Sequence, residues 1–201
     1  MKKILAVITV ATALLLSGCS QVGAAATIGD TKITQATVQT SIDSIIAARV
    51  GVDTSQMQLE TGEALNRGQL RFHVLTTLLK ATGQQLKLTV TKAEIDTRRA
   101  SIIEQVGGES GLPNALVGAG IASEDLDTYI EAMTYSDKLG QALTANGVAS
   151  ADLGTEIQKL IVAKAKELGV TVNPRYGKWD ASVADVVAND SASPAVTPAT
   201  K

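Results

Sequence analysis

The single histidine, His73, is the first residue to consider for chemistry, because imidazole serves both acid–base catalysis and metal binding. It lies between Phe72 and Val74 in a leucine-rich stretch. A catalytic triad also needs a nucleophile and an acid brought to the imidazole, and a metal site needs further ligands. The sequence signals neither arrangement. We therefore interpret His73 as a structural or surface histidine and predict no metal site.

Four carboxylates, Glu104, Glu109, Glu124 and Asp125, offer in principle a pair for acid–base catalysis. Acidic residues at helix starts and in loops have a plainer use as partners of the helix dipole and as solvated caps. The Gly-rich stretches GGESG and GAG are not phosphate loops, because no strand–GxxxxGK–helix context surrounds them. We therefore predict a protein that is not an enzyme, with no catalytic residue and no cofactor.

The only cysteine, Cys19, closes the sequence Leu16-Ser17-Gly18-Cys19, which resembles the lipobox of bacterial lipoproteins. Two lysines and an apolar stretch from Ile4 to Leu16 precede it, and this stretch is too short to span a membrane as a stable helix. Lipid attachment requires a thiol at the new N-terminus, because diacylglycerol is joined through sulfur. We predict that residues 1–18 are a lipoprotein signal peptide and that Cys19 is acylated. The alternative is an ordinary secretory signal that contains a cysteine.

Lipidation would hold the mature chain on the extracytoplasmic face of the cell membrane, since several acyl chains, palmitate included, anchor stably where one would be marginal. With its only cysteine consumed, the chain has no disulfide, and its stability must come from a packed core. About 180 residues remain, enough for one sizeable domain. A formal charge of −2 without a basic block gives no reason to expect nucleic-acid binding.

The N-terminal part of the mature chain is predicted to form a tether, a hairpin and a helix. Residues 19–25 are small and form the tether, and ATIGDTKIT predicts a β-hairpin that turns at Gly29-Asp30. Thr34 is placed to cap a helix that stops at Gly51. One apolar stripe along this helix is formed by Val38, Ile42, Ile45, Ile46 and Val50.

More helices follow a loop at 51–62. The next helix carries Leu65, Phe72, Leu75, Leu78 and Leu79 and ends around Gly83. Thr91 and Glu94 have the spacing of a capping box, and the helix after them is expected to bury Ile95, Ile102, Ile103 and Val106 and to expose Arg98 and Arg99. A short helix is expected at 113–117, then one capped by Ser123, and a last one from about 151 to 168 that ends at Gly169 in the left-handed conformation.

The segment VTVNPRYGKWD at 170–180 then predicts an extended strand that contains the only tryptophan. An isolated strand cannot satisfy its own backbone groups, so we expect it to pair with the N-terminal hairpin and to join the two ends of the domain. Tyr176 and Trp179 are expected to pack this junction rather than to hold a ligand. The predicted fold is mostly α, with a small β element, over residues 26–187. Residues 188–201 are rich in Ser, Pro and Thr and are predicted to be a disordered tail.

The order of these elements resembles the chaperone domain of the SurA and PrsA class of extracytoplasmic foldases. The resemblance rests on ATIGDTKITQATVQ, on RFHVLTTLLKATGQQLKLTVTKAEID, on AGIASEDLDTYI and on GVTVNPRYGKWD, and it covers most of residues 25–180. Each motif is weak alone, and their order and spacing carry the resemblance. It implies a helical SurA N-terminal-like domain that binds polypeptide.

The chain departs from that class in one respect. Full foldases of this kind insert a parvulin-type prolyl isomerase domain before the terminal helix, whereas only TANGVASADLGT lies between Leu143 and Glu156. Parvulin sites use paired histidines, and this chain has one histidine. The resemblance therefore implies a form that lacks the isomerase.

The expected function is ATP-independent, holdase-like binding of unfolded polypeptide. Met57 and Leu59 in the loop and Phe72 in the following helix are the candidate contact residues, because Met adapts to varied apolar partners. The alternative for Met57 is a loop that packs its side chain on the core. The alternative function is a structural or assembly lipoprotein that docks one envelope partner. A small-molecule substrate is not expected, since periodic strands and pocket aromatics are missing.

Overall fold

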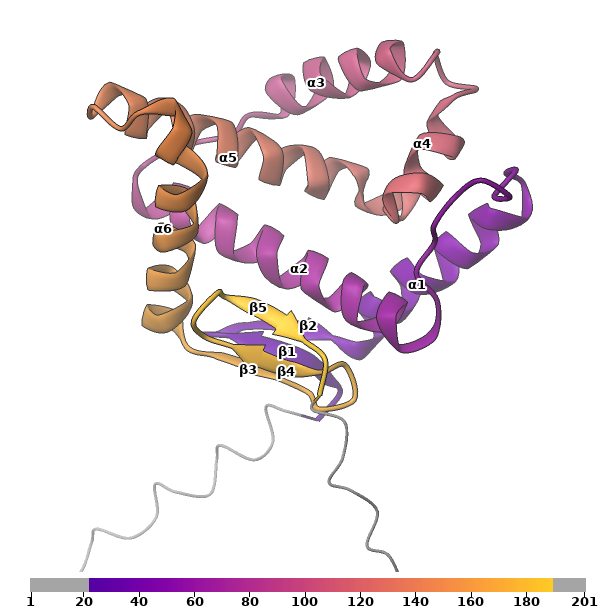
Figure 1. Ribbon diagram of the computed structural model, residues 1–201, viewed down its shortest axis with the longest axis horizontal. Helices are drawn as coiled ribbons and strands as arrows, with labels where there is room; N and C mark the ends of the chain where they lie inside the picture. The colour runs from indigo at the N-terminus through magenta and orange to yellow at the C-terminus, as the bar shows by residue number, and fades with distance from the viewer. Residues whose placement is uncertain (1–21, 190–201) are drawn as a thin grey trace, which may run out of the picture.

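The structure, a computed structural model, describes residues 22–189 (Figure 1). The predicted signal peptide, Cys19 and most of the predicted 188–201 tail lie outside the described residues. Six α-helices, two short 3₁₀ turns and five strands lie within them. In chain order they are β1 Ala24–Ile28, β2 Thr31–Thr34, α1 Gln35–Val50, α2 Gly62–Gln85, α3 Lys92–Gln105, α4 Leu112–Ala119, the 3₁₀ turn Ser123–Asp125, α5 Leu126–Ala145, the 3₁₀ turn Ser150–Asp152, α6 Leu153–Leu168, β3 Val170–Val172, β4 Lys178–Asp180 and β5 Asp185–Val187.

The two ends of the domain meet in one sheet, as the sequence predicted. Strand β1 is the centre of a three-stranded antiparallel sheet with order β2-β1-β3. Ala26 pairs with Ile33 on one side and with Val172 on the other. Gly29 turns the hairpin with a φ of 55°, a conformation that a side chain disfavours. The prediction of a mostly helical chain with a small antiparallel β element is confirmed.

The aromatic residues of this segment, in contrast, do not pair with the hairpin, and the pairing ends at Asn173, whose amide donates to the Ala25 carbonyl at 2.8 Å. Trp179 lies in β4, which pairs with β5 in a separate two-stranded sheet, with Trp179 opposite Val186. The turn at Asn173 redirects the chain, since its side-chain oxygen accepts from the Arg175 amide at 3.0 Å and its carbonyl accepts from the Tyr176 amide at 3.0 Å. The half-buried rings of Tyr176 and Trp179 still pack against the main core.

The main hydrophobic core lies between the sheets and helices α1, α2 and α6. Its largest fully buried side chains include Ile28, Val38, Ile45, Leu70 and Leu78. Ala24 and Ala25, which the sequence assigned to the tether, are buried in β1 and belong to the sheet.

The predicted apolar stripe of α1 is only partly a core face. Its first part is buried, whereas Ile46 is 50% exposed and Val50 is 89% exposed. These two residues lie near the end of α1, which projects from the body of the molecule (Figure 1). Periodicity along one helix cannot show where the elements that cover it stop.

Layers of helices stack outward from the sheets. Helix α2 lies above the sheets, α5 lies on α2, and α3 is the outermost layer on α5 (Figure 1). A second hydrophobic cluster, separate from the main core, is formed under α3. It consists of buried Leu116, Leu126 and Ile130 and half-buried Ile95, Ile102, Leu112, Ile121 and Tyr129.

The prediction that α3 has a buried face is wrong about the extent of burial, because α3 contains no buried residue and its isoleucines are only half-buried. A helix with one neighbour cannot bury a full face.

The sequence signals for helix starts and ends predicted the observed structure, with two exceptions. Thr34 caps α1, and Thr91 with Glu94 forms the expected capping box at α3. Ser123 instead opens a 3₁₀ turn and makes no capping hydrogen bond. Gly169 ends α6 with a φ of 73° but a ψ of 126°, so it is not left-handed helical. Over residues 22–189, no helix combines the length and apolarity needed to cross a bilayer.

Candidate functional site

A groove is formed where the loop after α1 passes over α2 and the end of α4. Its cavity volume is about 420 Å³. Leu59 of the loop and Phe72 of α2, two of the three candidate contact residues, both line it. The remaining apolar walls come from Leu65, Leu75, Val117, Ile121 and Tyr129. We call this cavity the Leu59–Phe72 groove.

Met57, the third candidate, is half-buried but does not line the groove. Its sulfur lies 4.0 Å from the position that a Cβ would occupy on Gly118 of α4. The loop therefore packs Met57 onto α4, which corresponds to the alternative interpretation of this residue, and presents Leu59 to the groove.

Two side-chain hydrogen bonds hold the walls of the groove together. Arg49, at the end of α1, donates from Nη2 to the carbonyl oxygen of Glu60 at 2.9 Å and ties the loop to α1. Gln69 of α2 donates from Nε2 to the carbonyl oxygen of Gly120 at 2.8 Å and ties the end of α4 to α2. Gly68 leaves room for the Glu60 carboxylate, which lies where a Cβ would project. These contacts fix a cleft between elements that are far apart in the sequence.

The chemistry of the groove suits binding. Its lining mixes buried and half-buried apolar side chains with the side-chain amides of Gln58 and Gln69 and with main chain near Gly118 and Gly120. Charged residues also line it: Arg49, Glu60 and Arg71. Clefts of this size and composition accept apolar side chains, and their few polar groups can hydrogen-bond to polar groups of the ligand. The described lining contains no histidine, cysteine or serine that would act as a base or nucleophile.

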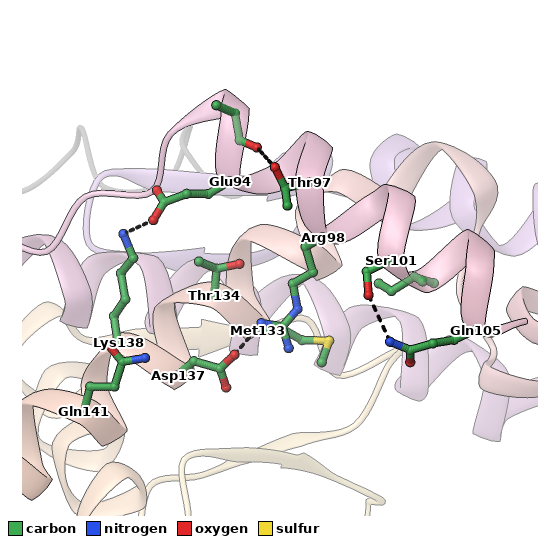
Figure 2. A pocket seen from close by; sticks show the side chains of 12 residues that line it. Glu94, Thr97, Arg98, Ser101, Gln105, Met133, Thr134, Asp137, Lys138 and Gln141 are labelled. Carbon is green, nitrogen blue, oxygen red and sulfur yellow. Dashed lines mark hydrogen bonds and ion pairs between the residues drawn. The ribbon is translucent and has the colours of Figure 1, made fainter.

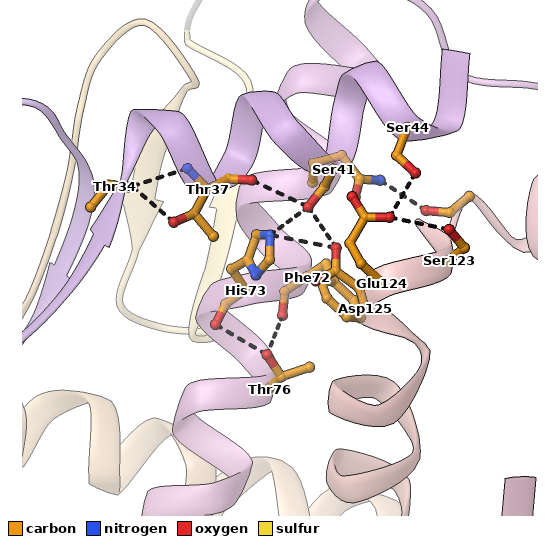
Figure 3. Close-up of polar contacts among 12 residues, drawn as sticks. Thr34, Thr37, Ser41, Ser44, Phe72, His73, Thr76, Ser123, Glu124 and Asp125 are labelled. Carbon is orange, nitrogen blue, oxygen red and sulfur yellow. Dashed lines mark hydrogen bonds and ion pairs between the residues drawn. The ribbon is translucent and has the colours of Figure 1, made fainter. Parts of the chain in front are cut away.

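His73 lies outside the groove, in a buried polar cluster that joins α1, α2 and the turn before α5 (Figure 3). Ser41 of α1 contacts His73 Nε2 at 3.0 Å and donates from Oγ to Asp125 Oδ2 at 2.5 Å. Asp125 Oδ2 lies 3.9 Å from the same ring nitrogen of His73. A catalytic triad needs its serine and its carboxylate at opposite nitrogens of the imidazole. This cluster lacks that geometry, and its contacts tie α1 to α2 and to the turn before α5.

Burial lowers the pKa of His73, and the nearby Asp125 carboxylate acts in the opposite direction. A serine also satisfies the neighbouring carboxylate, since Ser44 donates to Glu124 at 2.7 Å. Glu124 and Asp125 therefore each contact α1 through a serine, Ser44 and Ser41 respectively. Among residues 22–189, no group of three or more His, Cys, Asp or Glu side chains is arranged to hold a metal ion.

A second cleft, with a volume of about 750 Å³, lies between α3 and α5 (Figure 2). Its charged side chains pair across the two helices: Glu94 Oε1 lies 2.6 Å from Lys138 Nζ, and Arg98 pairs with Asp137. Hydrogen bonds from Lys138 and then from Thr91 lower the pKa of Glu94 to about 2.

Sequence reasoning missed this cleft, because it placed Arg98 and Arg99 on a solvated face. Both are half-buried, and Arg99 pairs with Asp127. The acidic residues of α5 were the available signal, and only the packing of α5 against α3 shows that they meet these arginines.

Comparisons with known protein families, with curated proteins and with solved structures find no match to this chain.

Proposed function

We propose that this protein is a lipid-anchored, extracytoplasmic holdase that binds unfolded polypeptide in the Leu59–Phe72 groove, without ATP and without isomerase activity. The observation that carries the proposal is that Leu59 and Phe72, selected from the sequence as contact residues, line one cleft although a helix boundary separates them. A cleft that combines apolar walls with a few amide and charged side chains accepts many different side chains, as a holdase requires.

The order of elements also supports this proposal. A hairpin leads into helices, and the chain returns after the last helix to add β3 to the hairpin. This is the order on which the resemblance to SurA and PrsA chaperone domains rests. We propose that the chain is a form of this domain in which the short segment before α6 stands where the isomerase would be inserted.

The proposed anchor is consistent with the position of the domain in the chain. Only Ser20 and Gln21 separate Cys19 from the described residues, and β1 begins at Ala24. A lipid on Cys19 would therefore hold the domain close to the membrane surface, where it would meet polypeptides that emerge on the extracytoplasmic side.

The test is suppression of aggregation of two unrelated clients, one unfolded by heat and the other by reduction of its disulfides. We expect Leu59→Gln to weaken suppression of both severalfold, because it puts a polar group into the apolar wall. Ile46→Gln is the matched control, since Ile46 is an aliphatic residue on the exposed end of α1 outside the groove. Equal suppression by the Leu59→Gln, Ile46→Gln and unchanged proteins would refute the groove assignment.

A second candidate function is docking of one envelope partner, as an assembly lipoprotein. The exposed pair Ile46 and Val50 favours it, because neighbouring apolar side chains on a projecting helix are typical of an interaction surface. In that case, crosslinking in cells captures one dominant protein, Ile46→Gln reduces that capture, and the purified protein protects neither aggregating client.

A further inference from the structure

Helix α3 is held far less firmly than the helix that supports the core. None of the residues of α3 is buried, whereas α2 buries Leu70, Val74 and Leu78 completely. The main neighbour of α3 is α5, through the half-buried Ile95 and Ile102. Segments with few buried apolar contacts open locally at a lower free energy than the whole fold.

Residues with positive φ lie in the segments on both sides of α3. Gly107 and Gly108 follow the helix with φ values of 89° and 86°, which only glycine adopts readily. Lys87, in the linker before α3, has a φ of 58° although it carries a side chain. Hinge motions use a few loop or element-terminal residues that absorb changes in φ and ψ, and these residues are often small.

Ion pairs close α3 onto α5. Glu94 pairs with Lys138, Arg98 with Asp137, and Arg99 with Asp127, and every one of these side chains is at least a quarter exposed to solvent. Exposed ion pairs stabilise weakly and are screened by salt. These ion pairs therefore orient α3 on α5 but stabilise its position only weakly.

The surface beneath α3 is apolar and continuous with the Leu59–Phe72 groove. Leu126 and Ile130 of α5 are buried there in a cluster of their own, so uncovering them leaves the main core intact. Ile121 and Tyr129 belong both to this cluster and to the wall of the groove. Outward movement of α3 would therefore extend the groove along α5.

We infer that α3 is a displaceable cover over a second polypeptide-docking surface, formed by Leu116, Leu126 and Ile130, that extends the Leu59–Phe72 groove. The inference rests on the proposed function, whose site it enlarges. The partner is an apolar segment that also carries two basic residues and one acidic residue, because displacement of α3 leaves Asp127 and Asp137 without their arginines and Lys138 without Glu94. Helix α3 itself, with Ile95 and Ile102 next to Arg98 and Arg99, has the chemistry of the segment that replaces it.

The first experiment measures hydrogen exchange along the mature chain and compares Arg98→Glu, Asp137→Arg and the double swap. We expect each single reversal to speed exchange in α3 about tenfold, the change for a surface ion pair replaced by like charges, while α2 is unaffected. The double swap restores the ion pair and the original rate. Exchange of α3 and α2 at one common rate in the unchanged protein would overturn the inference, because α3 would then open only on global unfolding.

The second experiment uses a labelled synthetic peptide of residues 91–106, the α3 sequence, as the probe. We expect it to bind the Arg98→Glu protein severalfold more tightly than the unchanged protein or the double swap. The same peptide with Ile95→Ser and Ile102→Ser should not bind. Equal binding of the probe to all three proteins refutes a covered docking surface.

The two proposals fail separately. If the probe binds the opened protein and no client is protected from aggregation, the holdase proposal fails and the cover stands. If Leu59→Gln weakens the protection of clients while the charge reversals change neither hydrogen exchange nor probe binding, the inference about α3 fails and the holdase proposal stands.

Discussion

Substitution of Gly83 by alanine tests the packing of α2 against α5 most directly. Gly83 is a buried helical residue, and a Cβ added to it would overlap the ring of Tyr135, with Cε1 at 2.8 Å and Cγ at 3.2 Å. Tyr135 is itself only 3% exposed, so its ring has little space into which to move. Gly140, in the middle of α5, is the matched control, because a Cβ there meets nothing within 4 Å.

The two substitutions should change stability in opposite directions. Alanine is better than glycine in a helix interior by about 0.8–1.0 kcal/mol, and Gly140→Ala gains this in full. At Gly83 the same gain is opposed by overpacking, which costs about 1–3 kcal/mol and falls at the upper end where several ring atoms are too close. We expect a net loss of about 2 kcal/mol. For a chain of this size that corresponds to a decrease in Tm of about 4–8 °C, against an increase of about 2–4 °C for Gly140→Ala.

Thermal unfolding followed by circular dichroism is the assay. The double variant Gly83→Ala/Tyr135→Leu removes the ring that the new methyl meets, so it should be less destabilised than the sum of its single changes. A Tm for Gly83→Ala that rises with that of Gly140→Ala would refute the packing of Tyr135 over Gly83.

Three further predictions concern pH, the chain ends and the lipid. Because burial lowers the pKa of His73 in the folded state, its contribution to stability is complete above the unfolded pKa of 6.5 and is lost as the pH falls toward the lower folded value. In denaturant unfolding, His73→Gln should therefore lose less stability than the unchanged protein as the pH falls. The same pH profile of stability for both proteins would contradict this prediction. Truncation after Leu168 removes β3 and the β4–β5 sheet and should abolish cooperative unfolding in circular dichroism, whereas truncation after Asn189 should leave the Tm unchanged. An equal Tm for both truncations would show that β3, β4 and β5 are not part of the cooperative fold. Cys19→Ala should release the protein from the membrane or leave it unprocessed, and equal labelling of both forms by a fatty-acid probe would contradict lipidation at this residue.

Part of the candidate groove was predictable from the sequence. Leu59 and Phe72 stood out because an apolar residue in a polar loop and an aromatic residue in a leucine-rich helix are recognisable from residue type alone. Ile121 and Tyr129, which complete the walls, were not, because they come from segments whose approach to α2 depends on the packing of α4 and α5. The charge pairing of α3 with α5 was missed for the same reason.

The sequence by itself determined the features that a few neighbouring residues fix. Thr34 and the pair Thr91 and Glu94 cap their helices through bonds spanning three residues, and Gly29 turns the hairpin through its own backbone freedom. Tertiary structure alone decided which apolar residues are covered, as the exposed Val50 shows, and which polar groups meet. Ser41, His73 and Asp125 come from three elements far apart in the chain, and they meet because packing brings these elements together and buried polar groups are hydrogen-bonded. Local hydrogen bonds and dihedral preferences are encoded residue by residue, whereas burial depends on the surfaces that the rest of the chain brings to each residue.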